Sequence, residues 1–490
     1  MSFRPVLRTP AILMASVLVV ACGGSDPVPV PAPPPVVVPE ETRAQDTRTF
    51  SAGATATATT FAAMAADAGD TVAMATTSRY AGMLGGAAYQ IEVPVNWNGK
   101  LVMYAHGFRG TNVPLTVNGP SIRRYLIQQG YAWAASSYSK NYYDVRAGVE
   151  DTNKLALNFN TITTAAGRTL AAPSRIYITG HSMGGHITGA AIEAEAAATA
   201  VNKVAYHGAV PMCGVMGDAE LFNQFAAMQV TAQALAGLPK YPTANWADIS
   251  ASVNAALWTT FPSVPTAQGA KYVQVVKNIT GGERPLFAQG MAFGGSFGSA
   301  YGTFGSDGTV TGILNKNVLD TNAYTYTIDG DATGSTALNA SVLKLTAAAD
   351  ANRLRRDGLR WIPVINGEIK IPVVSIHTLG DLFVPFSMQQ VYQKRVAAKG
   401  NSQWLVQRAI RGASHCDFTV AEQAEAFDAM IKWERDGIKP AGDDVVTPAT
   451  VAASNYGCTF TRNAMSVMGD ESGATRALRP NILLTTPACP

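Results

Sequence analysis

The stretch "ITGHSMGGHI", Ile178–Ile187, decides the fold because it places one serine in a tight, glycine-flanked turn. Residues 174–180 predict a buried strand before this turn, and the alanine-rich residues 184–199 predict a helix after it. Gly-x-Ser-x-Gly between a strand and a helix is typical of a nucleophile elbow, whose sharp turn excludes large side chains. The pattern therefore predicts Ser182 as a nucleophile, with a serine in an ordinary glycine-rich turn as the alternative.

Short apolar runs alternate with helical segments on both sides of this turn. Further strands are predicted at 100–108, 131–139, 203–212, 371–379 and 404–410, and further helices at 121–130, 144–165, about 388–400 and 420–436. Thr419 and Glu422 predict a capping box at the start of the last of these helices, and Gly437 predicts its end. Strands that alternate with helices favour a mostly parallel sheet with right-handed crossovers.

The alternation is interrupted once. Residues 214–365 are partly helical and then glycine-rich, and they follow no strand–helix pattern. We therefore expect an α/β core of residues 51–213 and 366–440, with a lid or cap inserted at 214–365. A C-terminal extension follows at 441–490.

Serine is a poor nucleophile until a base takes its proton, and the chain has six histidines from which to choose that base. Five are expected in other roles: His181 should point away from the serine, His186 should pack or be partly exposed, His106 belongs to "HGF", and His207 and His377 should be core residues inside strands. His415 remains. It lies in "RGASHCDFT", a loop after the last predicted strand, where catalytic residues of open α/β sheets gather.

An acid must orient the base, and two N–H groups must receive the oxyanion. Asp381 follows a predicted strand in "SIHTLGDLFVPFS"; a simple turn aspartate is the alternative. The backbone N–H groups of Phe108 and Met183 are the expected oxyanion donors. Gly107 allows the sharp turn beside the elbow.

The N-terminus predicts export. Arg4 and Arg8 precede the apolar run "AILMASVLVVA", which is too short to span a bilayer, and residues 1–21 are therefore a predicted signal peptide. "VVAC" ends at Cys22, a predicted lipidation site, and the proline-rich residues 22–50 would form a tether. We expect a lipoprotein on the periplasmic side or surface of an outer membrane; an ordinary secreted protein is the alternative.

Four cysteines remain after Cys22, and an even number in an exported chain predicts two disulfides. They are Cys213, Cys416, Cys458 and Cys489. Pairing the last two would staple the C-terminal extension and leave the first two as the other bond. Three connectivities are possible, and all remain open at this stage.

The motifs "HGF", "GHSMGG", "GDLFVP" and "ASHCDF" together resemble an α/β-hydrolase-fold serine hydrolase of the esterase or lipase type, over roughly residues 88–213 and 366–436. The resemblance implies helices on both faces of a mostly parallel central sheet, Gly180 and Gly184 as elbow glycines, and the chain order Ser, Asp, His. A cysteine directly after the histidine resembles tannases and feruloyl esterases. In that group a second cysteine precedes the serine, whereas here the position is His181, so Cys213 is the partner expected for Cys416.

Composition narrows the function further. The formal net charge is +3, and it falls to +1 without Arg4 and Arg8, which gives no electrostatic case for nucleic acid. No cofactor or metal motif is found, and "DGDATGS", 329–335, is expected to be a solvated turn rather than a calcium loop.

We expect a serine carboxylic-ester hydrolase acting on a small or polymeric ester. A peptidase or amidase with the same triad is the second hypothesis, and a non-catalytic surface binding protein is the third. The substrate and the oligomeric state are not predicted.

Overall fold

The computed structural model describes residues 49–52, 61–240, 242, 245–306, 318–355, 358–466, 470–486 and 489. The predicted signal peptide, Cys22 and residues 22–48 of the predicted tether lie outside these described residues.

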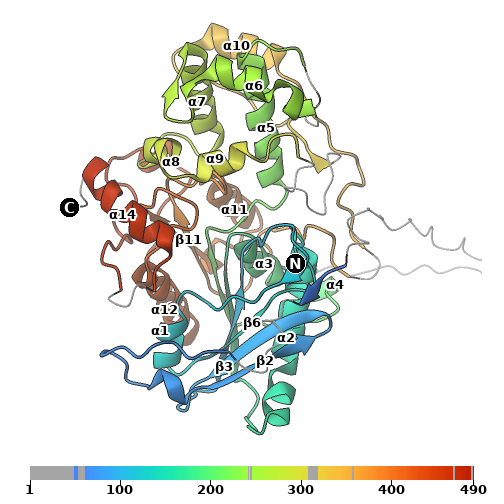
Figure 1. The fold of residues 1–490 in the computed structure, drawn as a ribbon, viewed down its shortest axis with the longest axis vertical. Helices are drawn as coiled ribbons and strands as arrows, with labels where there is room; N and C mark the ends of the chain where they lie inside the picture. The colour runs from blue at the N-terminus through green and yellow to red at the C-terminus, as the bar shows by residue number, and fades with distance from the viewer. Residues whose placement is uncertain are drawn as a thin grey trace, which may run out of the picture. The chain divides into compact units, whose positions relative to one another are not determined.

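The α/β core is built on an eight-stranded sheet, whose strands β2, β3, β6 and β11 are labelled in Figure 1. Its strands are β2 (Ser78–Leu84), β3 (Ala87–Val93), β4 (Lys100–Ala105), β6 (Ala132–Ser136), β7 (Arg175–His181), β8 (Gly208–Met212), β11 (Val373–Thr378) and β12 (Leu405–Ile410). They are arranged in the order β12-β11-β8-β7-β4-β6-β3-β2. β3 runs antiparallel to both of its neighbours, and every other pairing is parallel. This is the α/β-hydrolase fold, so the predicted fold class is confirmed.

Both faces of the sheet are covered by helices, which is why its central strands are apolar at consecutive positions rather than at alternate ones. In β4, Leu101 and Met103 pack in one core with α2 (Val145–Ala165), α3 (Met183–Ala191) and α11 (Ser387–Ala398). Val102 and Tyr104 pack in a second core with α1 (Arg123–Gln128) and α12 (Val420–Asp436). The parallel strands therefore present their carboxyl ends at one edge, where the predicted site residues gather.

Four features of the core differ from the sequence predictions. The strands β2 and β3 form a hairpin that begins at Ser78, whereas the predicted resemblance to the fold begins only at about residue 88. The hairpin turns at Gly85 and Gly86, which both have positive φ. The helix predicted over 184–199 is two helices, α3 and α4 (Ala194–Thr199), because the buried Glu193 between them accepts N–H groups of a distant loop. β8 begins after His207. α12 is followed by α13 (Pro448–Val451) and α14 (Gly473–Thr485), so it is not the last helix.

The insertion is mainly helical among its described residues. It contains α5 (Glu220–Leu235), α6 (Trp246–Leu257), α7 (Ala267–Ile279), α8 (Phe287–Ala292), α9 (Ser296–Tyr301) and α10 (Ala332–Ser341), with the short antiparallel pair β9 (Trp258–Thr260) and β10 (Val264–Pro265). Figure 1 shows α6, α7 and α10 at one end of the molecule, and α8 and α9 nearer to the sheet. The insertion has an apolar cluster of its own, which includes Val230, Val275 and Tyr326.

The remaining elements lie at the margins. They are β1 (Ser51–Ala52), which pairs in parallel with β5 (Pro114–Leu115), and the 3-10 turns η2 (Met74–Thr76) and η5 (Ser402–Trp404). A disulfide joins Cys458 to Cys489 across the C-terminal extension. No helix in the described part of the chain combines the length and the apolar character needed to cross a membrane.

Candidate active site

Ser182 lies at the junction of β7 and α3 with φ 59° and ψ −121°, a conformation that L-residues rarely adopt. The turn closes because two glycines leave room for the backbone. A Cβ on Gly180 would lie 2.6 Å from the carbonyl oxygen of Ala105, and a Cβ on Gly184 would overlap the same oxygen. The Ser182 N–H donates to the Met212 carbonyl at 3.1 Å, which ties the turn to the end of β8.

The structure brings Ser182, His415 and Asp381 together from three loops. The Oγ of Ser182 lies 2.8 Å from Nε2 of His415, and Nδ1 of His415 lies 2.6 Å from Oδ2 of Asp381. Since an ionised carboxylate only accepts, Nδ1 carries the proton, and Nε2 is left as an acceptor for the serine hydroxyl. Oδ1 of Asp381 accepts the N–H groups of Phe383 and Val384, each at 3.0 Å, so both oxygens of this fully buried carboxylate are bonded.

The other histidines near the site are engaged elsewhere. His181 bonds Tyr104 and Gln423 and points away from the serine, as expected. His186 is fully buried between Tyr143 and the Pro363 carbonyl, which excludes the partly exposed position.

His377 is a buried neighbour of the acid. Its Nε2 donates to the Val384 carbonyl at 2.7 Å and lies 3.8 Å from Oδ2 of Asp381. Burial lowers the pKa of His377 to about 4, so its imidazole stays neutral beside the carboxylate. It is a core histidine, as predicted.

The "HGF" loop lies against the elbow. A Cβ on Gly107 would lie 3.2 Å from the Cβ of Ser182, so a side chain there would crowd the nucleophile. Nδ1 of His106 donates to the Gly107 carbonyl at 2.7 Å, and the Tyr138 hydroxyl donates to the His106 carbonyl at 2.9 Å. Because the peptide group is planar and trans, fixing the Gly107 carbonyl also fixes the direction of the Phe108 N–H.

Tyr138 is a support that the sequence analysis missed. Its ring stacks on the His106 imidazole with 4.1 Å between centroids, and its backbone has φ 61°. No sequence signal indicates this role, because a tyrosine two residues after β6 has no local pattern that specifies a left-handed conformation.

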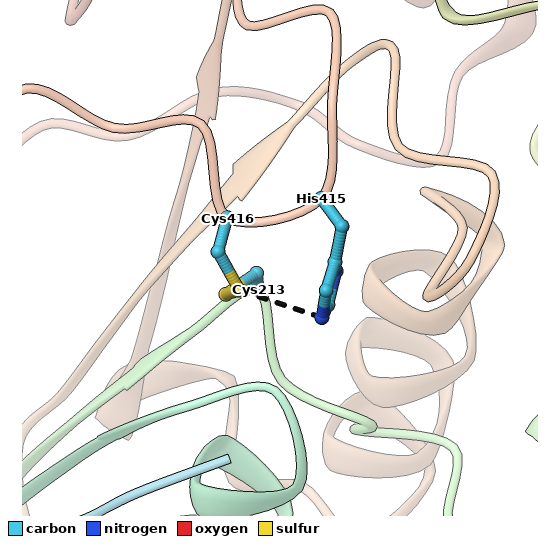
Figure 2. Close-up of side chains that lie close together, drawn as sticks. All are labelled: Cys213, His415 and Cys416. Carbon is cyan, nitrogen blue, oxygen red and sulfur yellow. Dashed lines mark hydrogen bonds between the residues drawn. A yellow bond between two sulfur atoms is a disulfide. The ribbon is translucent and has the colours of Figure 1, made fainter. Parts of the chain in front are cut away.

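A disulfide joins the end of β8 to the loop that carries the base (Figure 2). Cys213 pairs with Cys416, as the resemblance led us to expect, and Cys458 pairs with Cys489. Sγ of Cys416 lies 3.5 Å from Nε2 of His415. Although these two cysteines and His415 cluster like metal ligands, bonded sulfur atoms are not thiolates, so the cluster is a disulfide beside an imidazole rather than a metal centre.

The C-terminal extension holds the other side of the same loop. The Arg479 guanidinium, fully buried, donates to the Asp417 carbonyl at 2.6 Å and to Oε2 of Glu422 at 2.8 Å. Oδ2 of Asp417 accepts the Ala413 N–H at 3.0 Å. The loop that carries His415 is therefore tied by a disulfide at Cys416 and by a buried ion-pair cluster at Asp417.

Residues 329–335 are a turn at Asp329 and Gly330 followed by the N-cap and first residues of α10. Asp331 caps α10 and pairs with Lys271, and Asp329 pairs with Lys277. The prediction of a turn is therefore correct for the start of the segment and wrong for its end, which is helical because Asp331 caps α10 by accepting the Gly334 N–H.

No protein-family model matches the chain. Over 91 residues it is 29% identical to o-phthalyl amidase from Xanthobacter agilis, a match that spans 19% of this chain and 20% of that protein. Solved structures similar to it include feruloyl esterase B from Aspergillus oryzae (TM-score 0.40, 15% identity, covering 74% of this chain and 82% of that chain). Another is an acylaminoacyl peptidase from Pyrococcus horikoshii (TM-score 0.37, 10% identity, 76% and 43%). The chain thus spans under half of that peptidase, and the interpretation of the site rests on its own geometry.

Proposed function

We propose that the chain is a serine hydrolase that cleaves carboxylic esters through an acyl-enzyme. The observation that carries the proposal is the continuous chain of contacts from Oγ of Ser182 through His415 to Asp381, at 2.8 and 2.6 Å, on a strained elbow. A hydroxyl, a neutral imidazole and a buried carboxylate in this order are the elements of nucleophilic catalysis by serine.

The chemistry follows from the proton positions. Nε2 of His415 takes the hydroxyl proton as Oγ of Ser182 attacks the ester carbonyl, and the imidazolium is stabilised by Asp381. The N–H groups of Phe108 and Met183 receive the oxyanion, with the N-terminus of α3 adding a favourable dipole. His415 then protonates the departing alcohol, and water attacks the acyl-enzyme by the reverse sequence.

The side chains beside the reacting groups favour apolar or aromatic substrate groups. Phe383 is partly exposed and lies edge-on to the His415 ring, with 5.5 Å between centroids. Phe225 lies behind it at the same centroid distance. Aromatic rings in such an arrangement bind flat apolar groups through offset or edge-to-face contacts.

A secreted amidase or peptidase is the second candidate, and the sequence similarity to an amidase favours it. The same triad attacks an amide, so the pocket decides the scissile bond. Export is part of both proposals: two disulfides are typical of an oxidising compartment, and lipidation at Cys22 would add an anchor.

Labelling by a fluorophosphonate probe tests the proposal. Wild-type protein should be labelled, and the folded Ser182→Ala variant should not. A panel of p-nitrophenyl esters and matched p-nitroanilides then separates the two candidates. A folded wild type that neither labels nor hydrolyses any member of the panel would contradict both.

A further inference from the structure

The insertion reaches into the loops that carry the acid and the base. Oγ of Ser296, the first residue of α9, accepts the Leu382 N–H at 3.0 Å and donates to the Gly380 carbonyl at 3.4 Å. These two groups belong to the residues immediately before and after Asp381. The hydroxyl thus bridges the turn that holds the carboxylate, and Ser296 itself is buried.

Two glycines at the end of α8 and just after it bring the same segment into backbone contact with both loops. A Cβ on Gly290 would overlap the carbonyl oxygen of Gly380, in the acid turn. A Cβ on Gly294 would overlap the carbonyl oxygen of Ala413, in the base loop. Contact this close leaves no space for a side chain or for water between the insertion and either loop.

An arginine before α8 adds a charge to the same contact. Arg284 is buried, and its Nε donates to the Leu379 carbonyl at 2.8 Å, two residues before the acid. The guanidinium also donates to two neutral groups, the Gly282 carbonyl and the Thr280 hydroxyl. Burial lowers the pKa of the Arg284 guanidinium to about 10, and the negative charge of the nearby Asp381 opposes part of this effect.

We propose that Ser296 is a positioning residue for the Asp381–His415 pair, and that residues 284–296 are a fixed wall of the site rather than part of a moving lid. The inference rests on the proposed function, because it assigns the insertion a role in placing the acid and the base. The Ser296 hydroxyl restrains the residues before and after Asp381. The close contacts at Gly290 and Gly294 fix the distance between the acid turn and the base loop.

The first test compares Ser296→Ala with Ser299→Ala. Ser299 lies on the same helix, but it is exposed and its hydroxyl bonds only within its own segment, to Gly295. Loss of the bridge should slow fluorophosphonate labelling about tenfold, which corresponds to one lost buried hydrogen bond. With p-nitrophenyl acetate as substrate, the kcat of Ser296→Ala should fall and its KM should stay unchanged. Ser299→Ala should match the wild type, and Ser296→Thr, which keeps the hydroxyl, should recover most of the rate.

The pH profile separates positioning from general damage. The other titratable groups near the His415 imidazole are Asp381, His181 and His377, with Arg284 behind them. A less well-held carboxylate stabilises the imidazolium less, so the acid limb of the labelling rate in Ser296→Ala should move to lower pH than in the wild type. An unchanged rate and an unchanged acid limb would overturn the proposal.

A glycine pair provides a second test that does not depend on Ser296. Gly294→Ala should displace the base loop and slow labelling, whereas a Cβ on Gly298 would meet its nearest atom, in Phe261, at 4.0 Å and should have no effect. Equal labelling of Gly294→Ala and Gly298→Ala would contradict the fixed wall.

Proton NMR distinguishes failure of this inference from failure of the proposed function. The Nδ1 proton shared by His415 and Asp381 should give a far-downfield signal in the wild type that weakens or shifts in Ser296→Ala. If the wild type shows this signal but is not labelled by the probe, the hydrolase proposal fails. The difference in signal between the wild type and Ser296→Ala still tests whether Ser296 positions the pair. A signal identical in both proteins would overturn that role.

Discussion

The nucleophile turn and the two loops that face it are held in different ways. Ser182 is positioned by glycines within two residues of it and by contacts with the neighbouring strands β4 and β8. Asp381 and His415 are positioned by parts of the chain added to the core: Ser296 from the insertion and Arg479 from the C-terminal extension. The nucleophile is thus specified locally, while the acid and the base depend on additions that have no motif.

The physical reason lies in what each backbone can bond to. An elbow continues directly from a buried strand into a helix, so its N–H and C=O groups join existing ladders. The loops after β11 and β12 leave the sheet, and their polar groups need partners from outside it. The insertion and the extension supply those partners, and the Cys213–Cys416 bond ties the base loop back to β8.

The largest effect is expected where the extension holds the base loop. Arg479→Met should leave Asp417 and Glu422 buried without their cation and lower the free energy of unfolding by about 3–5 kcal/mol. Denaturant unfolding measures this loss, and labelling of the remaining folded protein should also slow. Arg435→Met is the control, because the ion pair of Arg435 with Asp436 is solvent-exposed, and its loss should leave the unfolding transition close to that of the wild type. An Arg479→Met protein as stable as the wild type would show that the extension does not hold the base loop.

The next effect tests the local side of the comparison. Gly184→Ala puts a methyl group into the Ala105 carbonyl and must shift the elbow. A displacement of about 1 Å at a reacting group costs about 100-fold in rate, so fluorophosphonate labelling should fall by about that factor. Gly69→Ala, whose Cβ would meet nothing within 4 Å, is the matched control. If Gly184→Ala is labelled as fast as the wild type, the elbow is less constrained than its contacts indicate.

The third effect concerns pH, is absent at neutral pH, and involves both sides of the site. Burial lowers the pKa of His106, beside the elbow, and of His377, beside the acid, from 6.5 to about 4. Between these pH values the unfolded chain binds protons that the folded protein excludes. The stability that depends on these two neutral imidazoles is therefore fully present above pH 6.5. Below that pH the free energy of unfolding falls by about 1.4 kcal/mol per pH unit for each imidazole.

The free energy of unfolding should depend less steeply on pH between 6.5 and 4 in His106→Gln and in His377→Gln. Each variant should lack the contribution of one imidazole to that slope. Denaturant titrations at several pH values measure it. Equal reductions would show that burial alone sets the slope, whereas a change in only one variant would show that the two sides of the site differ in their access to water.

Local patterns accounted for much of the fold. The Thr419–Glu422 capping box and Gly437 gave the bounds of α12, because capping involves groups within one turn of each other. The hairpin of β2 and β3 was missed although Gly85 and Gly86 mark its turn. The break between α3 and α4 had no local signal, since it depends on Glu193 bonding a loop 174 residues away.

The sequence by itself determined the elbow, the alternation of strands and helices, and the three residue types that the chemistry needs. Each of these follows from interactions within a few residues, or from residue order along a sheet that is wound in sequence. Only the tertiary structure decided which cysteines pair, that Ser182 meets His415 across 233 residues, and that Ser296 and Arg479 hold the loops. Those contacts join segments whose separation leaves no periodicity, so their geometry exists only once the whole chain has packed.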